Sequence, residues 1–157
     1  MRLTKQTSYA IRILIHCALS NGQNVRAGDI ARLNGITEYN VAKIVPILVR
    51  AGFLETSRGR AGGLRLARPA AEIGIGKVLR ATESTNVEAE CVGGHAPDCG
   101  IKSAAPINRM LGQALKAFVG VLDQHNLADL IGSRPPDRAL VKPRGVRPSR
   151  MTGAADA

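Results

Sequence analysis

The chain has 157 residues, of which 45% are hydrophobic and 3% aromatic, and its 22 Lys and Arg against 12 Asp and Glu give a formal net charge of +10. This length suits one domain, or one domain with an appendage, and the hydrophobic content is sufficient for a core. No apolar run approaches the roughly 18 residues of a membrane helix, and a charged amphipathic segment follows Met1 instead of a signal peptide. We therefore expect a cytoplasmic protein with no membrane partner, whose thiols stay reduced.

The first predicted helix lies in "TSYAIRILIHCALS", which is almost continuously apolar after Tyr9. Thr7 and Ser8 are its candidate N-caps, and "NGQN" ends it. Cys17 falls on an apolar face of this helix, which indicates a buried structural thiol. The next stretch, "VRAGDIARLNGI", predicts a short second helix that ends at Asn34-Gly35, a pair suited to a left-handed turn.

A third helix is predicted in "TEYNVAKIVPILVRAGF", with Thr37 as its N-cap and Gly52 as its stop. Pro46 removes a hydrogen bond inside this helix and predicts a kink. The apolar residues recur at three- and four-residue spacing, so we expect them to face inward: Val41, Ile44, Val45 and Leu48. The opposite face then carries Tyr39, Asn40, Lys43 and Arg50.

Two helices joined by a tight glycine turn, the second with a polar outer face, follow the helix-turn-helix plan. In that plan the N-terminal side chains of the second helix reach base edges in the major groove. Asn pairs well with adenine and Lys with guanine, and Glu can accept a hydrogen bond from cytosine. The predicted DNA-contacting residues of this helix are Thr37, Glu38, Tyr39, Asn40 and Lys43.

The stretch "FLETSRGRAGGLRLA" predicts a strand, a glycine-rich turn and a second strand. A β-hairpin directly after a recognition helix is the wing of a winged helix, and Arg58, Arg60 and Arg65 would contact the DNA backbone or a narrow minor groove. A phosphate-binding loop is disfavoured, because the turn lacks the Lys-Ser/Thr ending and precedes a strand. A short helix in "PAAEIGIGKVLRATE" should then bury Ile75, Val78 and Leu79.

The distribution of charge supports this assignment. Residues 1–83 hold 13 Lys and Arg against 5 Asp and Glu, whereas residues 84–132 hold 3 against 5. The last segment, residues 133–157, holds 6 against 2 and contains four prolines, which favours a disordered basic tail. A basic unit beside a module of different charge is typical of nucleic-acid binding, although charge alone is also compatible with other roles.

A long helix is predicted from Pro106 to about Gln124. Its apolar stripe after a complete small domain favours packing on the same helix of a second subunit, and the alternative is that it folds back on its own domain. The residues of this predicted dimer interface are Ile107, Leu111, Leu115, Phe118 and Leu122. The predicted organisation is a DNA-binding domain, a cysteine-bearing loop, a dimerisation helix and a tail, at residues 1–83, 84–105, 106–132 and 133–157.

The stretch "ECVGGHAPDCGIKSAAPINRM", residues 90–110, covers the end of this loop and the start of the predicted helix, and it contains Cys91, His95 and Cys99. Three interpretations stay open: a metal or iron–sulfur site, a thiol switch, and two inert cysteines. Zinc is disfavoured because its strong signal is a C-x₂-C pair and seven residues separate these thiols. An enzyme is also disfavoured, because His95, Asp98 and Cys99 lie in a loop with no scaffold to orient them.

Three stretches together resemble a known family: "MRLTKQTSYAIRIL", "VAKIVPILVRAGFLETSRGRAGGLRLA" and "LGQALKAFVGVLDQHNLADLI". They are similar to the winged-helix iron–sulfur regulators of the NsrR, RirA and IscR type, and the resemblance covers residues 1–132. It implies a homodimeric bacterial transcription regulator whose DNA affinity depends on a cluster held before the dimerisation helix.

The resemblance places the family's first two loop cysteines on Cys91 and Cys99, but its third on Ala105. The His of IscR-like proteins falls on Asn108, and the N-terminal acidic residue of NsrR-like proteins falls on Ser8. A cluster needs four ligands. His95 could be a third ligand, or two subunits could pool their cysteines around one cluster.

We therefore expect a mainly α-helical fold with a small β-hairpin: a winged helix-turn-helix followed by a long dimerisation helix. The expected function is a repressor that binds a double-stranded DNA operator as a homodimer. Its affinity would respond to a [2Fe–2S] or [4Fe–4S] cluster, or to a redox, nitric oxide or iron signal, at Cys91 and Cys99. The alternative is a winged-helix regulator or protein-interaction module without any cofactor. Neither is an enzyme.

Overall fold

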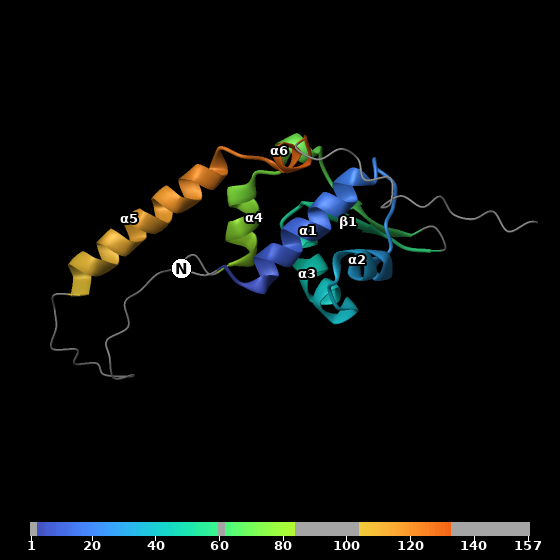
Figure 1. Cartoon of the computed structure of the whole chain (residues 1–157), viewed down its shortest axis with the longest axis horizontal. Coiled ribbons are helices and arrows are strands. Elements are labelled where there is room, and N and C mark those ends of the chain that lie inside the picture. Colours follow the sequence, from blue (N-terminus) through green and yellow to red (C-terminus); the bar gives the residue numbers. More distant parts are fainter. Residues whose placement is uncertain (1–2, 60–61, 84–103, 133–157) are drawn as a thin grey trace, which may run out of the picture.

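The computed structural model describes residues 3–59, 62–83 and 104–132, with the backbone alone at residues 104–108. Within these ranges the chain is mainly helical and contains one antiparallel β-hairpin, which confirms the expected fold class. The elements are α1 (Lys5–Leu19), α2 (Ala27–Asn34), α3 (Glu38–Arg50), β1 (Leu54–Ser57), β2 (Gly63–Leu66), the 3-10 helix η1 (Ala70–Glu72), α4 (Ile75–Thr82), α5 (Ala104–Asp123) and α6 (Leu127–Gly132). Figure 1 shows α1, α2, α3 and the hairpin gathered into one body, from which α5 extends on the side of α4.

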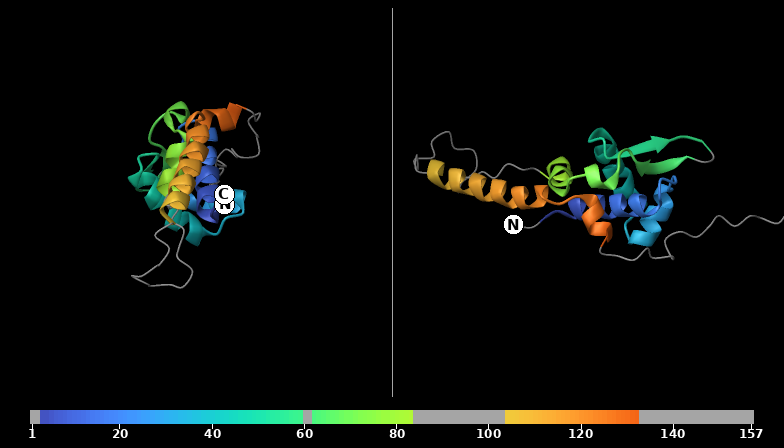
Figure 2. Two further views of the ribbon diagram at one scale, coloured as in Figure 1. Left: turned by 90° about the vertical axis from the view of Figure 1, so that its left-hand side faces the viewer. Right: turned by 90° about the horizontal axis from the view of Figure 1, so that it is seen from above.

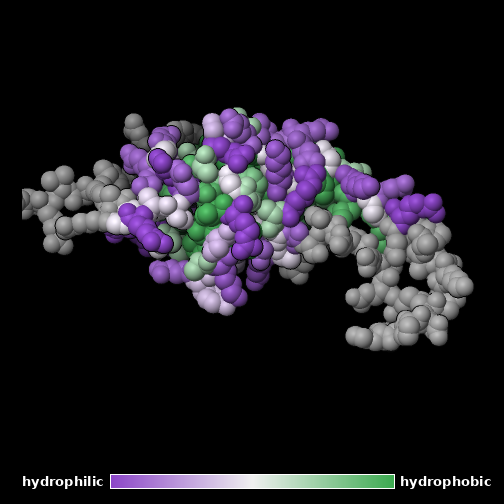
Figure 3. All heavy atoms as spheres, turned by 180° about the vertical axis from the view of Figure 1, so that it is seen from behind, coloured by the Kyte–Doolittle hydropathy of each residue, from purple (hydrophilic) through white to green (hydrophobic). Residues whose placement is uncertain are grey.

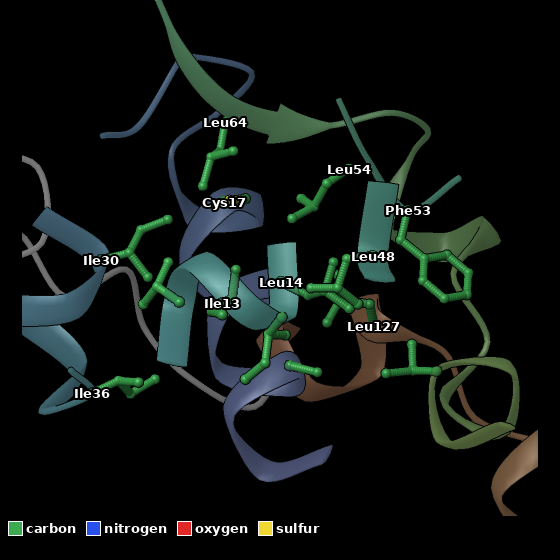
Figure 4. Packing of buried hydrophobic residues seen from close by; sticks show 14 of the residues in the cluster. Ile13, Leu14, Cys17, Ile30, Ile36, Leu48, Phe53, Leu54, Leu64 and Leu127 are labelled. Atoms are coloured by element: carbon green, nitrogen blue, oxygen red, sulfur yellow. The ribbon is translucent and has the colours of Figure 1, made fainter. Parts of the chain in front are cut away.

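The core is built around α1, because its apolar residues at three- and four-residue spacing form one face of the helix. Ala10, Ile13 and Leu14 have no exposed surface, and Cys17 is also buried, as predicted. Side chains from α2, α3, the hairpin and α6 close over this face, as Figure 4 shows for Ile30, Leu48, Leu54, Leu64 and Leu127. The core thus holds the second and third helices and the wing in fixed positions around the first helix.

The predicted N-cap of the first helix is wrong. The helix begins at Lys5, and the N-cap residue is Thr4 rather than Thr7 or Ser8. Thr7 is 1% exposed and its hydroxyl hydrogen-bonds to residues at the end of α4. A local pattern of polar residues followed by apolar ones suggested a cap, but a contact between distant parts of the chain occupies that hydroxyl.

The helix-turn-helix follows the prediction closely. Gly35 adopts a left-handed conformation with φ 60° at the end of α2. The Thr37 hydroxyl then accepts a hydrogen bond from the Asn40 backbone N–H at 3.3 Å, as an N-cap does. Of the four residues predicted to face inward, Val45 is half-buried and the others are buried. Pro46 does not end α3, which continues to Arg50.

The wing is a two-stranded ladder in which Leu54 pairs with Leu66 and Ser57 with Gly63. Val25, in the segment before α2, forms a bridge with Leu64 and so fastens the hairpin to the helices. Gly63 has no room for a side chain, because a Cβ there would lie 2.7 Å from the Val25 carbonyl oxygen. The wing is therefore attached at its base, and its two strands extend away from the body (Figures 1 and 2).

The long helix α5 is attached to the body near its C-terminal end. Val119 is buried against α4, and Asp123 forms an ion pair with Arg80 of α4. Figure 2 shows the rest of α5 extending beyond the body. The short helix α6 then returns to the core: reciprocal hydrogen bonds between Asn126 and Asp129 cap it, and Leu127 is fully buried.

Candidate nucleic-acid interface

The outer face of α3 presents polar and cationic side chains to solvent. Tyr39 is 66% exposed, and Lys43 and Arg50 are exposed. The Lys43 Nζ lies 4.5 Å from the centre of the Tyr39 ring, a cation–π contact across one helical turn. Asn40 is half-buried beside them. Since α3 is the second helix of the helix-turn-helix, this is the face that would enter a major groove.

Glu38 lies at the edge of this face and is directed toward α2. A Cβ at Gly28, in the first turn of α2, would lie 3.2 Å from the Glu38 Oε1. A carboxylate beside the N-terminal turn of a helix is favoured by the partial positive charge there. The Glu38 side chain thus lies against α2. It would have to turn away from α2 to make the predicted contact with a cytosine.

In the wing, the predicted cations have different surroundings. Arg58 is exposed beside Gly59, which has φ 96° at the turn. Arg65 pairs with Glu55, its direct partner across the ladder. Arg60 lies outside the described residues. A phosphate near Arg65 would therefore compete with a carboxylate, whereas Arg58 has no such competitor within the described part of the chain.

Four arginines of the body have partners inside the protein. Arg32 forms an ion pair with Asp29 at 2.9 Å, and Arg80 pairs with Asp123. Arg12 donates to the Asn34 carbonyl, and Arg68 donates to the Gly52 carbonyl at 2.9 Å. Lys43, by contrast, forms no ion pair within the described residues. Its charge is therefore available to an anionic ligand.

Four residues fasten the start of α1 to the end of α4, directly before the cysteine-bearing segment. The Glu83 Oε1 accepts hydrogen bonds from the Thr4 backbone N–H at 2.8 Å, from the Thr4 hydroxyl at 2.7 Å and from the Thr7 hydroxyl. The Thr7 and Thr82 hydroxyls lie 2.8 Å apart. We call Thr4, Thr7, Thr82 and Glu83 the threonine–glutamate cluster. Partial burial alone would raise the pKa of Glu83, but the hydrogen bonds from Thr7 and Thr4 outweigh it and lower that pKa.

The predicted metal ligands Cys91, His95 and Cys99 lie outside the described residues. In the described part, no group of His, Cys, Asp or Glu is arranged to hold a metal ion. Cys17 is the cysteine found there, and burial raises the pKa of its thiol to about 12. A thiol that stays protonated and covered is a poor ligand or nucleophile, so Cys17 is a core residue.

The side chains of the predicted apolar stripe on α5 differ in how far they are exposed. Leu111, Leu115 and Leu122 are half-buried, and Phe118 is 39% exposed, while the Ile107 side chain lies outside the described set. Met110 at 63% and Val121 at 57% are more exposed than any of these. Figure 3 shows apolar surface between hydrophilic atoms on the side of the molecule that holds α5.

Sequence reasoning missed the threonine–glutamate cluster, the Arg80–Asp123 ion pair and the exposed apolar residues Met110 and Val121. The first two join residues far apart in the chain, so no local pattern could reveal them. The third had a signal: Met110 and Val121 are 11 residues apart, which is three helical turns, and they therefore share a face. None of the described helices is long and apolar enough to cross a membrane.

Comparison with known proteins gives a consistent result. Residues 3–133 match the family model Rrf2, described as an iron-dependent transcriptional regulator. The chain is 44% identical to protein aau3 of Rhizobium meliloti strain 1021, over 86% of this chain and 88% of that protein. It is 41% identical to the HTH-type transcriptional regulator NsrR of Geobacillus kaustophilus strain HTA426, over 92% of this chain and 99% of that protein. Its fold is similar to that of CymR, the global cysteine regulator of B. subtilis, with a TM-score of 0.66. That match covers 86% of this chain and 99% of CymR, and the two sequences are 23% identical.

Proposed function

The chain belongs to the Rrf2 family of winged-helix, DNA-binding transcription regulators, and from this premise we propose that it is a cytoplasmic, homodimeric repressor whose operator affinity responds to a signal received at Cys91 and Cys99. Membership of this family makes the chain a regulator rather than an enzyme. The resemblance of the sequence to iron–sulfur regulators agrees with this family membership.

Lys43 on α3 and Arg58 at the wing support the DNA-binding surface most directly, because both are exposed cations that form no ion pair within the described residues. In a winged helix these two elements reach the major groove and the adjacent backbone or minor groove. With them we assign Thr37, Glu38, Tyr39, Asn40, Arg60 and Arg65 to the same surface, as the sequence predicted. A net charge of +10 favours the encounter with a polyanion.

The exposed face of α5 supports the homodimer. Met110, Phe118 and Val121 are large apolar side chains that a lone subunit leaves in water. Because α5 extends beyond its own body, the same helix of a second subunit can pack along this face (Figure 2). The predicted stripe of Ile107, Leu111, Leu115, Phe118 and Leu122 would flank it. Two subunits would then present two recognition helices to two half-sites.

Two cysteines and one histidine are the donor set for a cofactor. An iron–sulfur cluster takes four ligands, mostly thiolates and sometimes imidazole. Cys91, Cys99 and His95 supply three such groups, and Ala105 stands where the related regulators have another cysteine. The set fits a cluster if one more ligand joins it or if two subunits share their cysteines. The cluster would supply a redox-active group, and its loss or oxidation would change the conformation of the segment that contains Cys91 and Cys99.

The threonine–glutamate cluster and the Arg80–Asp123 pair support a route for the signal. Glu83 directly precedes the segment with the cysteines and is bound to the start of α1, the core helix under α3. Asp123 links α5 to α4. A change in the segment between α4 and α5 would thus act on both the DNA-binding body and the dimer helix, and so on the distance between two recognition helices.

The test compares Cys91→Ala, Cys99→Ala and a matched control, Cys17→Ala, which removes a thiol outside the segment. Protein is purified without oxygen, and operator binding is titrated before and after a nitric oxide donor, an oxidant or an iron chelator. We expect the control to keep the response of the wild type and the two segment variants to lose it. An unchanged response in Cys91→Ala would contradict the proposed sensor.

Ala105 and Asn108 favour a second candidate, a regulator that has no cofactor, because they replace two ligand positions implied by the resemblance. That protein would bind the same operator with an affinity indifferent to all three treatments. If it bound protein instead of DNA, the steep fall of DNA affinity with salt expected for phosphate contacts would be missing.

A further inference from the structure

Tyr39 and Lys43 form a unit on the surface of α3. They are separated by one helical turn, and the Lys43 ammonium lies over the Tyr39 ring, 4.5 Å from its centre. Tyr39 is 66% exposed, so the position of its ring is not dictated by burial in the core. An ammonium over the face of an aromatic ring is attracted by the negative charge of that face.

Nothing else in the described structure fixes the Lys43 side chain. It takes part in no ion pair there, and Glu38, the acidic residue at the start of the same helix, is directed toward Gly28 of α2. A lysine side chain is long and flexible, and its three donors can serve any acceptor. Without a fixed position the Lys43 ammonium would contact the DNA phosphates, which are the same whatever the base sequence.

We propose that Tyr39 is a positioning residue: its ring holds the Lys43 ammonium at one place on the recognition helix, where Lys43 can read the guanine edge in the major groove. The inference rests on the proposed operator-binding function and adds to it the residue that sets specificity. Guanine presents two acceptors there, O6 and N7, to a correctly placed donor. The ring therefore favours the specific complex over non-specific contact.

The test is a double-mutant cycle on the full-length chain. Wild type first selects a preferred duplex from a random pool, and a scrambled duplex of the same composition is the reference. Affinities for both are then measured for Tyr39→Phe, Tyr39→Leu, Lys43→Met and the double variant Tyr39→Leu/Lys43→Met. Arg50→Met is the matched control, because Arg50 is an exposed cation of the same helix. Circular dichroism checks that these surface variants are folded.

A surface cation–π contact corresponds to roughly two- to fivefold in an equilibrium constant. We expect Tyr39→Leu to lower affinity for the selected duplex by about that factor, with the scrambled duplex and the salt dependence unchanged. Tyr39→Phe keeps a ring face and should match wild type. In the Lys43→Met background, Tyr39→Leu should have no further effect. Arg50→Met should weaken both duplexes alike.

Two results would overturn the inference: an equal loss in Tyr39→Phe, or an additive loss in the double variant. Either would mean that Tyr39 contacts DNA by itself. If the wild type binds no duplex, the proposed function fails and the inference with it, and the first titration shows this before any variant is made.

Discussion

The hydroxyl groups of Thr7 and Thr82 lie 2.8 Å apart inside the protein, although the two residues are 75 positions apart in the chain. The Thr7 hydroxyl donates to Glu83, so the proton of the Thr82 hydroxyl is shared between Thr7 and the Val78 carbonyl, which lies 2.9 Å from the Thr82 hydroxyl. Hydrogen bonds between polar side chains thus join the two helices at the end of α4, directly before the segment with the cysteines.

Replacing Thr7 by Val keeps the shape of the buried side chain and removes its hydroxyl. Glu83 would lose one donor, and we expect the free energy of unfolding to fall by about 1–2 kcal/mol, as measured by urea denaturation. Ser8→Ala, at an exposed position of the same helix, is the control and should change stability by less than about 0.5 kcal/mol. Equal effects in the two variants would refute the importance of the cluster.

The lowered pKa of Glu83 predicts a dependence of stability on pH. A carboxyl whose folded pKa lies below the unfolded one stabilises the fold above the unfolded pKa, ordinarily about 4.3, and this contribution is lost as pH falls through the folded pKa. Urea unfolding is measured from about pH 6 to about pH 3. Glu83→Gln should show a weaker decline than the wild type; parallel curves would show that Glu83 is not the titrating group.

Gly76 fixes the approach of α5 to α4. A Cβ there would lie 2.1 Å from the Asp123 Oδ1 and 3.1 Å from the Asp123 backbone nitrogen. Gly76→Ala should therefore displace Asp123, break its ion pair with Arg80 and destabilise the protein. Gly120→Ala, where nothing lies within 4 Å of the added carbon, should instead raise stability by about 0.5–1 kcal/mol. A neutral Gly76→Ala would show that α5 is not held at this point.

The proposed dimer predicts the effect of charge on the exposed face of α5. Met110→Lys places an ammonium in the interface, and we expect the dissociation constant of the dimer to rise by roughly tenfold or more. Analytical ultracentrifugation measures it. Gln113→Lys, on the same helix at an exposed polar position, should leave the dimer intact. A monomeric wild type, or a Met110→Lys dimer of unchanged strength, would contradict this interface.

The sequence predicted the helices, the wing and the α3 face because their signals are local. Gly35 needs a left-handed conformation, Thr37 is a cap three residues before its donor, and Val41, Ile44 and Leu48 recur at helical spacing. The Thr7–Glu83 and Arg80–Asp123 contacts could not be predicted, because each depends on where distant segments meet. The direction of Glu38 toward Gly28 was missed for the same reason: it depends on the angle between two helices.

We propose that Cys91 and Cys99 hold a signal-responsive cofactor in a DNA-binding dimer. The most direct measurement is the visible absorption spectrum of protein purified without oxygen, with iron and acid-labile sulfide assayed in the same sample. We expect a visible absorption band with iron and sulfide in proportion to protein, all lost in Cys91→Ala and kept in Cys17→Ala. A colourless, iron-free protein that still binds its operator would contradict it.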